Sequence, residues 1–538
     1  MAGLIDSFFT KNKIALLAFL TFGCVCGAVF RYDMEWWDFV NYHYYNAWAF
    51  LNDRMNVDIL PAVVNSFISP FIDLPVYFLT NALNDHPVVY SAIMAVPYGL
   101  MMFVAFKTAA LFFDADTRRG RIMIVLSLLL SVCSVFVFME LSGTTHEHSM
   151  SFLSLTALYL LLKKLPSRDL DAKTCLISGF LLGIAAGLKM TYCLYAASTG
   201  ITLILFAKSF DRPVKSVALF ALAGTAGFLI AYGYWGWFLW KNFENPFFPF
   251  LNGFFQSSYG EEGNYKDVRY FNLPWLNVIF YPVHMFFHIG GDFSMRNRFV
   301  FSNLRLIVGM IVFAAAFVKI AKDRVTRKEK DPADDLFFFL IIWMTIAYVI
   351  WLGLFRVYRY MIPFDLMLSI VLVRFFFNKA TFSLKSFSFA ARSFLLLCFV
   401  AYTGYECAHL PYSRRTDRPM LPTNIQKVPN DTLLLLRYIP ASMFVPFLVP
   451  NSTVRAVAAP EFRVSVNGSR IHTVGYFGLK AKKLIAQHQK QGKPVAYIVG
   501  RNQFRYSEEE GLEKICDTLD VLRGADFDYY YFLCPLPK

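Results

Sequence analysis

Charged side chains are scarce in this chain. Only 17% of its 538 residues are Asp, Glu, Lys or Arg, whereas 57% are hydrophobic. Soluble domains carry about 25% charged residues, so the composition excludes an ordinary soluble protein and indicates one that crosses a membrane many times. The formal net charge of +14 fits that class, because excess Lys and Arg collect in the cytoplasmic loops of membrane proteins. We therefore expect no nucleic-acid partner.

Signatures of several other classes are absent. No G-x-G-x-x-G or G-x-x-x-x-G-K-[ST] run occurs, which disfavours a nucleotide-sugar donor and ATP-driven chemistry. No small-residue cleavage site follows the first apolar run at 14–30, so we expect this run to be kept as a span. The nine cysteines lack the paired spacing of a zinc site. Cys516 and Cys534 could form a disulfide or remain two free thiols, and the sequence leaves both alternatives open.

Hydrophobic runs of about 20 residues, long enough to span a bilayer, recur along the first three quarters of the chain. About eleven occur, at 14–30, 87–113, 121–139, 149–163, 174–189, 192–208, 215–239, 303–321, 335–353, 358–377 and 388–405. The predicted fold class is therefore mainly α: a polytopic bundle of transmembrane helices, with helices in its extracytoplasmic loops and a small α/β domain at its C-terminal end.

The last part of the chain has a different character. Helical patterns at 477–491 and 507–519 alternate with strand-like runs at 452–458, 495–499 and 529–532. About 120 residues are enough to bury a separate core. We predict a membrane domain over 1–409 and an α/β domain over 410–538.

The loops indicate an orientation. Basic clusters at alternate ends of the spans mark the cytoplasmic side; they are Lys11 and Lys13, then Arg118, Arg119 and Arg121, then Lys163, Lys164 and Arg168, then Lys208, Arg212 and Lys215. The apolar run at 275–291 contains Pro282, His284 and His288, so we expect an interfacial or re-entrant helix there. The alternation then puts the N-terminus in the cytoplasm and the tail on the other side, so we expect a multi-pass protein of the plasma (inner) membrane whose tail is periplasmic or otherwise extracytoplasmic.

The polar stretch at 31–77 is the first candidate site. If a helix starts near Trp36, helical spacing places Asn41, Tyr42 and Tyr45 on the same face as Asp38. A carboxylate backed by amide and phenol groups suits a site that binds a polar ligand and takes up a proton. The alternative is an acid that only stabilises a helix start. The neighbouring His43 is a further binding residue, and other acids could take the role of Asp38, namely Asp33, Glu35, Asp58 and Asp73.

A second cluster lies in the outer loop LSGTTHEHSM. His146, Glu147 and His148 could coordinate a metal, but three consecutive residues point in different directions, so a shared ion needs ligands from elsewhere. We favour Glu147 as an acid that orients substrate, and Glu140 could do the same. We expect no cofactor, and a divalent metal stays an open but less favoured alternative.

Basic side chains occur on the same outer face. Lys189 ends one span, where a lysine faces a partner or snorkels to the interface. Arg356, Arg359 and Tyr360 repeat the pattern between later spans, and arginine can bind two phosphate oxygens at once. The basic groups predict an anionic, membrane-embedded substrate. Further charge comes from loop arginines, namely Arg269, Arg296, Arg298 and Arg305.

Several blocks together resemble a bacterial family of polytopic membrane glycosyltransferases of the GT-C class. The family pattern is close to WD-x-x-NYH-x-YN, D-x-x-PA, NP-x-x-D-x-P-x-Y, GLK-x-T, NP-x-FP-x-x-N and RY-x-x-P. The blocks present here, in the same order, are WWDFVNYHYYNAWAFL, DILPA, SPFIDLPVY, ELSGTTHEHS, GLKMT, NPFFPFLNGFFQSSY and YRYMIPFDL. Two positions depart from the pattern: Ser69 replaces the usual Asn before Pro70, and Asp365 stands where Glu is common.

This resemblance implies an inverting transfer of sugar from a polyprenyl-phosphate donor to an extracytoplasmic glycan, lipid or protein. It implies that Asp38 is the general base, Glu147 a second acid, and Lys189 and Arg359 the ligands of the donor phosphate. Two other classes stay open. A transporter or flippase of lipid-linked sugars would need mid-span binding residues and inverted repeats, neither of which is evident. A non-catalytic assembly protein would work through its tail.

Overall fold

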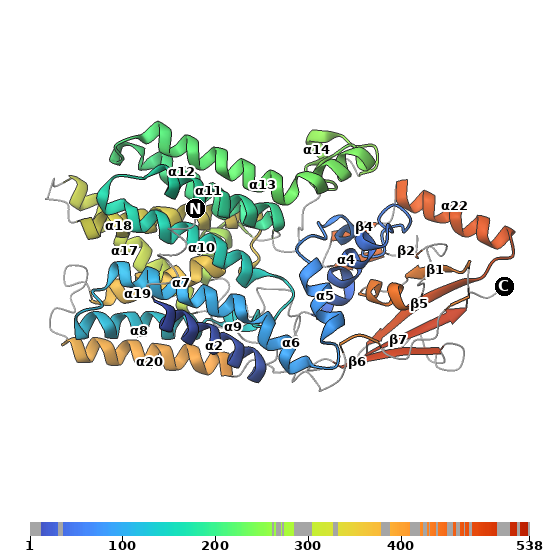
Figure 1. Ribbon diagram of the computed structural model, residues 1–538, viewed down its shortest axis with the longest axis horizontal. Helices are drawn as coiled ribbons and strands as arrows, with labels where there is room; N and C mark the ends of the chain where they lie inside the picture. Colours follow the sequence, from blue (N-terminus) through green and yellow to red (C-terminus); the bar gives the residue numbers. More distant parts are fainter. Residues whose placement is uncertain are drawn as a thin grey trace.

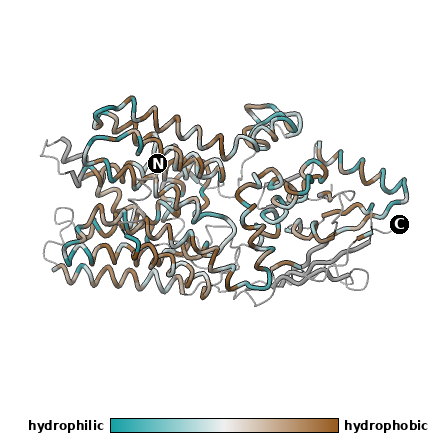
Figure 2. Tube along the Cα trace, in the orientation of Figure 1, coloured by the Kyte–Doolittle hydropathy of each residue, from teal (hydrophilic) through white to brown (hydrophobic). Residues whose placement is uncertain are grey.

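The computed structural model describes residues 12–30, 36–260, 263–264, 271, 274–283, 304–325, 332–377 and 388–408, and most of 420–502 and 517–535 with short gaps. Long helices make up one end of the molecule, and a sheet with its helix makes up the other (Figure 1). The segments between 36 and 82 lie against the sheet, where α4 and α5 are drawn. The long helices are largely hydrophobic (Figure 2).

Each hydrophobic run of the sequence coincides with one helix or with two consecutive ones. These helices are α2 (Lys13–Val29), α6 (Pro87–Met94), α7 (Val96–Phe112), α8 (Arg118–Val132), α9 (Val135–Met139), α10 (Glu147–Lys164), α11 (Ala172–Leu188), α12 (Cys193–Leu205), α13 (Pro213–Phe243), α17 (Leu304–Val325), α18 (Pro332–Leu354), α19 (Ile362–Phe377) and α20 (Phe389–Ala408). Among the described residues, four helical stretches are long and apolar enough to cross a membrane, at 87–112, 213–243, 335–354 and 358–377, and five more are shorter apolar helices.

Glycines allow two of the helices to pack closely. Gly179, Gly183 and Gly187 recur every fourth residue on α11 and face α13. A Cβ atom at Gly183 would collide with the carbonyl oxygen of Gly224 on α13. Small residues at this spacing let the backbones of two membrane helices approach each other. The close contact holds the C-terminal end of α11, which carries Lys189, in a fixed position.

Helix α19 lies in the centre of the helical part. All its residues from Ile362 to Val373 are buried. Its one acid, Asp365, forms an ion pair with Arg305 of α17 at 3.0 Å and accepts a hydrogen bond from Ser134. A buried charge among apolar helices needs such a partner, so Arg305 stabilises the bundle here instead of adding to the outer site.

A π-helical segment changes the register of the helix at 36–51. We call this helix the first outer helix, and residues 36–82 the first outer segment, after the side of the membrane on which the sequence predicts them to lie. That helix has three consecutive parts: α3 (Trp36–Asp38), the π-helical η1 (Phe39–His43) and α4 (Tyr44–Leu51). A π turn inserts one extra residue and rotates the side chains that follow it. Tyr45, expected on the face of Asp38, is therefore turned to Asp58, and its hydroxyl donates to Oδ2 of that residue at 2.6 Å.

The rest of the first outer segment contains η2 (Val63–Phe67) and α5 (Leu74–Ala82). Of the interfacial helix expected at 275–291, the structure describes α15 (Trp275–Ile279) and one further turn at 281–283. The remainder, with His284 and His288, lies outside the described residues.

The tail contains a five-stranded sheet with the order β2-β1-β5-β7-β6. Its strands are β1 (Leu433–Leu436), β2 (Ala456–Ala458), β5 (Val495–Asn502), β6 (Asp517–Arg523) and β7 (Asp528–Pro535). Helix α22 (Tyr476–Lys490) coincides with the helical pattern at 477–491, and β3 (Arg463–Val466) pairs with β4 (Ser469–His472). The helix expected at 507–519 is wrong at 517–519, where β6 begins because Asp517 and Thr518 pair with β7. Its other residues, Cys516 among them, lie outside the described part.

The tail and the first outer segment share one hydrophobic core. Tyr44 and Tyr45 of α4 belong to the same buried cluster as Leu434 and Ile498 of the sheet. Ile59 adds a parallel bridge to Val457 on β2, the outermost strand on that side of the sheet. Packing of this kind fixes α3, η1 and α4, and with them Asp38 and His43, against the sheet.

Candidate active site

Asp38 and Arg359 form an ion pair across the fold. Nη1 of Arg359 lies 3.2 Å from Oδ2 of Asp38, and both side chains are partly exposed, at 21% and 15%. Asp38 ends α3, and Arg359 lies in η7 (Tyr358–Met361), the short 3-10 turn that precedes α19. The ring of Tyr360 lies below two cations, 5.6 Å from Cζ of Arg359 and 5.7 Å from Nζ of Lys189.

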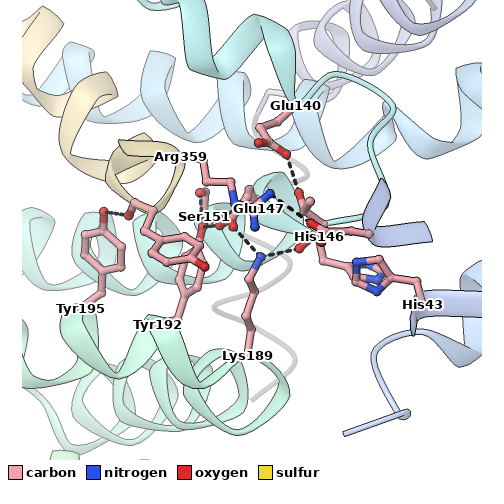
Figure 3. Close-up of polar contacts among 12 residues, drawn as sticks. His43, Glu140, His146, Glu147, Ser151, Lys189, Tyr192, Tyr195 and Arg359 are labelled. Carbon is pink, nitrogen blue, oxygen red and sulfur yellow. Dashed lines mark hydrogen bonds and ion pairs between the residues drawn. The ribbon is translucent and has the colours of Figure 1, made fainter. Parts of the chain in front are cut away.

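Glu147 and Lys189 form the second ion pair of the site (Figure 3). Glu147 is the first residue of α10, where the helix dipole favours an acid. Lys189 follows α11, and its Nζ also donates to the carbonyl oxygen of Thr145 at 2.5 Å. The hydroxyl of Tyr192 donates to Oε2 of Glu147 at 2.9 Å and lies 2.8 Å from Oγ of Ser151. The buried carboxylate is thus held on both oxygens.

The two ion pairs belong to one site. Arg359 lies within electrostatic range of Glu147 and Glu140 as well as Asp38, and Figure 3 shows it beside Glu147 and Tyr192. Glu140 in turn accepts a hydrogen bond from Thr145. Two cations and several carboxylates at the N-terminal ends of α10 and α19 and at the C-terminal end of α11 can bind an anion and accept a proton at neighbouring positions.

A third group of contacts converges on Asp73. Nδ1 of His43 lies 2.6 Å and Nε2 of His146 lies 3.0 Å from the same oxygen, Oδ1 of Asp73. Burial disfavours the charged carboxylate, but the charge of His43 and the hydrogen bonds from both imidazoles outweigh it and hold the pKa of Asp73 below its ordinary value. Burial lowers the pKa of His146 against the opposing effect of Asp73, so this imidazole is neutral near pH 7.

Three other candidate residues, Asn41, Tyr42 and Arg356, do not belong to the two ion pairs. Asn41 and Tyr42 are buried in η1, and the ring of Tyr42 lies 4.1 Å from that of His43. Arg356 has a left-handed backbone with φ 56°, donates to the carbonyl oxygen of Leu352 at 2.8 Å and covers the ring of Phe271.

Five of the candidate acids and arginines fall outside the described residues: Asp33, Glu35, Arg269, Arg296 and Arg298. Asp58 has a structural position, because it pairs with Arg54 through both oxygens, at 2.6 and 3.1 Å, and accepts the backbone N–H of Ala456 at 2.8 Å. It is therefore fully engaged away from Arg359.

Sequence reasoning missed Tyr192 and the pairing of both histidines with Asp73. Tyr192 stands three residues after Lys189, and its single turn η4 (Met190–Tyr192) brings both side chains to Glu147. That short spacing was the one signal available for Tyr192. No spacing relates His43, Asp73 and His146, which are brought together only by the fold.

No protein-family model and no curated protein matches the chain. Solved structures to which it is similar include two of ArnT from Cupriavidus metallidurans, one bound to undecaprenyl phosphate and one in the apo state. The first has 12% sequence identity and a TM-score of 0.49, and the second has 14% and 0.40. Both alignments cover 99% of this chain and 98% of the other. Similarity at these values gives no information on what this chain binds or does.

Proposed function

We propose that this protein is an inverting GT-C-type glycosyltransferase that moves a sugar from a polyprenyl-phosphate donor to an extracytoplasmic hydroxyl group. The observation that carries the proposal is the contact of Asp38 with Arg359, because it joins the expected base to an expected phosphate ligand across 321 residues. The sequence blocks that resemble the GT-C family support it. The count of about eleven spans, the cytoplasmic N-terminus and an α/β domain after residue 409 that packs on the segment around α4 belong to the same proposal.

Each cation of the site is occupied by a carboxylate. Arg359 holds Asp38, and Lys189 holds Glu147. The phosphate of a lipid-linked sugar offers several oxygens to the planar guanidinium and can displace a single carboxylate oxygen. Donor binding would therefore release Asp38 beside the sugar that is to react.

The reaction then needs positioning and charge stabilisation. Asp38 accepts the proton of the acceptor hydroxyl group, whose oxygen forms the new bond to the anomeric carbon. The bond from that carbon to the phosphate oxygen breaks, and polyprenyl phosphate leaves with the electron pair, so the configuration inverts. Lys189 and Arg359 stabilise the charge that develops on the phosphate.

The test is transfer by purified full-length protein from a panel of short-chain polyprenyl-phosphate sugars. Asp38→Asn is expected to lower the rate at least about 100-fold, as removal of a general base does. The matched control is Asp53→Asn, which makes the same change at an exposed residue whose left-handed φ of 54° asparagine tolerates. An active Asp38→Asn protein would exclude Asp38 as the base. If the protein transferred sugar from no donor but moved lipid-linked sugar across a vesicle membrane, the enzyme proposal would be wrong and a transporter would take its place.

A further inference from the structure

The ring nitrogens of His43 and His146 meet on one carboxylate oxygen, and each of the three residues comes from a different element. His43 ends η1, Asp73 precedes α5, and His146 precedes α10 with a left-handed φ of 63°. One ligand atom from each lies within 4.8 Å of the others. The loop at 140–148 alone could not surround an ion, and the fold supplies the missing ligands from two other segments.

The three side chains of this cluster are largely removed from solvent. Asp73 is fully buried, and the side chains of His43 and His146 are 5% and 9% exposed. Although both histidines are close enough to donate, they approach the same oxygen, Oδ1. The other oxygen of Asp73, Oδ2, and Nε2 of His43 are buried without a hydrogen-bond partner. A buried carboxylate with one oxygen left unpaired is costly, which indicates that hydrogen bonding alone does not account for the arrangement.

We propose that His43, Asp73 and His146 bind a divalent transition-metal ion, with zinc as the best match. Two imidazoles and one carboxylate form a three-residue ligand set that leaves a coordination position open. Magnesium and calcium fit less well, because they prefer oxygen ligands throughout. A zinc ion with bonds of about 2.0–2.1 Å would hold its ligand atoms about 3.3 Å apart, so the two contacts of 2.6 and 3.0 Å need to open by less than about 1 Å.

The surrounding charge supports a cation. Among the described residues of the site, carboxylates outnumber basic side chains by two: the acids are Asp38, Asp73, Glu140 and Glu147, and the bases are Lys189 and Arg359. A divalent ion would neutralise the excess. Because Glu147 follows His146 directly, the ion would fix the start of α10 and the direction of the Glu147 carboxylate.

This inference goes beyond the transferase proposal and is tested without any measurement of transfer. Full-length protein that carries no polyhistidine tag is purified, stripped with a chelator and dialysed against Zn²⁺ or Co²⁺. Elemental analysis then gives bound zinc per chain, and visible absorption of the Co²⁺ form reports nitrogen and oxygen ligands. We expect about one ion per wild-type chain, and a Co²⁺ band, since the ligand set provides one site.

His43→Gln and His146→Gln are each expected to weaken binding more than about 100-fold, which exceeds the effect of losing an outer-shell partner. His86→Gln is the matched control, because His86 is exposed at the start of α6, and it should bind as the wild type does. Wild-type protein that binds no zinc and gives no Co²⁺ band would overturn the proposal, and this result needs no variant to fold. Binding that both glutamine variants retain would overturn it as well.

Discussion

Arg359 and Asp38, which stand 321 positions apart, meet at 3.2 Å where the first outer helix approaches α19. The pair closes the site between the segment that packs on the tail and the centre of the helical bundle. Neither residue is fully buried, so a charged ligand can reach both. Arg359 is therefore suited to exchange the Asp38 carboxylate for another anion, and the ion pair is less suited to stabilise the fold.

This exchange predicts different effects of two substitutions at Arg359. Arg359→Lys keeps the charge but loses the planar fork, and Arg359→Gln loses both. We expect kcat/KM for the lipid-linked donor to fall about 10- to 100-fold in the lysine variant, the value of one charge-assisted hydrogen bond, and further in the glutamine variant. Steady-state kinetics over a range of donor concentrations measures this. Equal activity of all three proteins would remove Arg359 from the donor site.

The ion pair of Lys189 with Glu147 predicts a strong coupling between the two residues. Lys189→Met leaves Glu147 buried without its cation, whereas the double variant Lys189→Met/Glu147→Gln removes both charges. We expect the loss of stability in the double variant to be smaller, by about 1–3 kcal/mol, than the summed losses of the two single variants. Unfolding in detergent measures these losses.

A surface pair provides the control for that coupling. Lys164 and Asp171 lie 2.8 Å apart with side chains 38% and 34% exposed. Lys164→Met should change stability by less than about 1 kcal/mol, because solvent screens such a pair. If Lys189→Met is equally harmless, Lys189 does not hold Glu147 in place.

The shared core predicts that the tail cannot be removed without damage to the site. Leu434 of β1 is fully buried in the cluster that contains Tyr44 and Tyr45. Leu434→Ala should destabilise the protein by about 2–5 kcal/mol through the cavity it leaves. Leu479→Ala, at a residue 62% exposed on α22, should cost less than about 0.5 kcal/mol. Thermal unfolding compares them, and an intact, active chain that ends at residue 411 would show the core to be dispensable.

Close helix packing predicts a contrast between two glycines. Gly183→Ala places a Cβ atom against the backbone of α13 and should lower the free energy of unfolding by about 1–3 kcal/mol, as overpacking does. Gly233→Ala, whose Cβ atom would lie 3.9 Å from its nearest neighbour, should be neutral or stabilising because alanine favours the helix. Thermal unfolding of both variants is the measurement. A stable Gly183→Ala protein would mean that α11 and α13 can move apart freely.

The helices were predictable because long apolar runs leave few other structures open, and the runs at 174–189 and 215–239 coincide with α11 and α13. Asp38, Glu147, Lys189 and Arg359 could be named from residue type and position. Their pairing could not, since no local pattern relates residues that are 42 or 321 positions apart. The π turn at 39–43 and the strand at 517–523 were missed because tertiary contacts overrode the local helical period.

Asp58 and Ile59 contact β2, so this part of the fold can form only after the C-terminal part of the chain has been synthesised. The carboxylate of Asp58 accepts a hydrogen bond from the backbone N–H of Ala456, which is synthesised 398 residues later. A ribosome adds about 5–20 residues per second, so roughly 20–80 s pass between synthesis of the early segment and synthesis of its partner strand. During that interval its aromatic face has no cover. Correct assembly therefore depends on the segment at 36–82 remaining free to pack until the last quarter of the chain has been made.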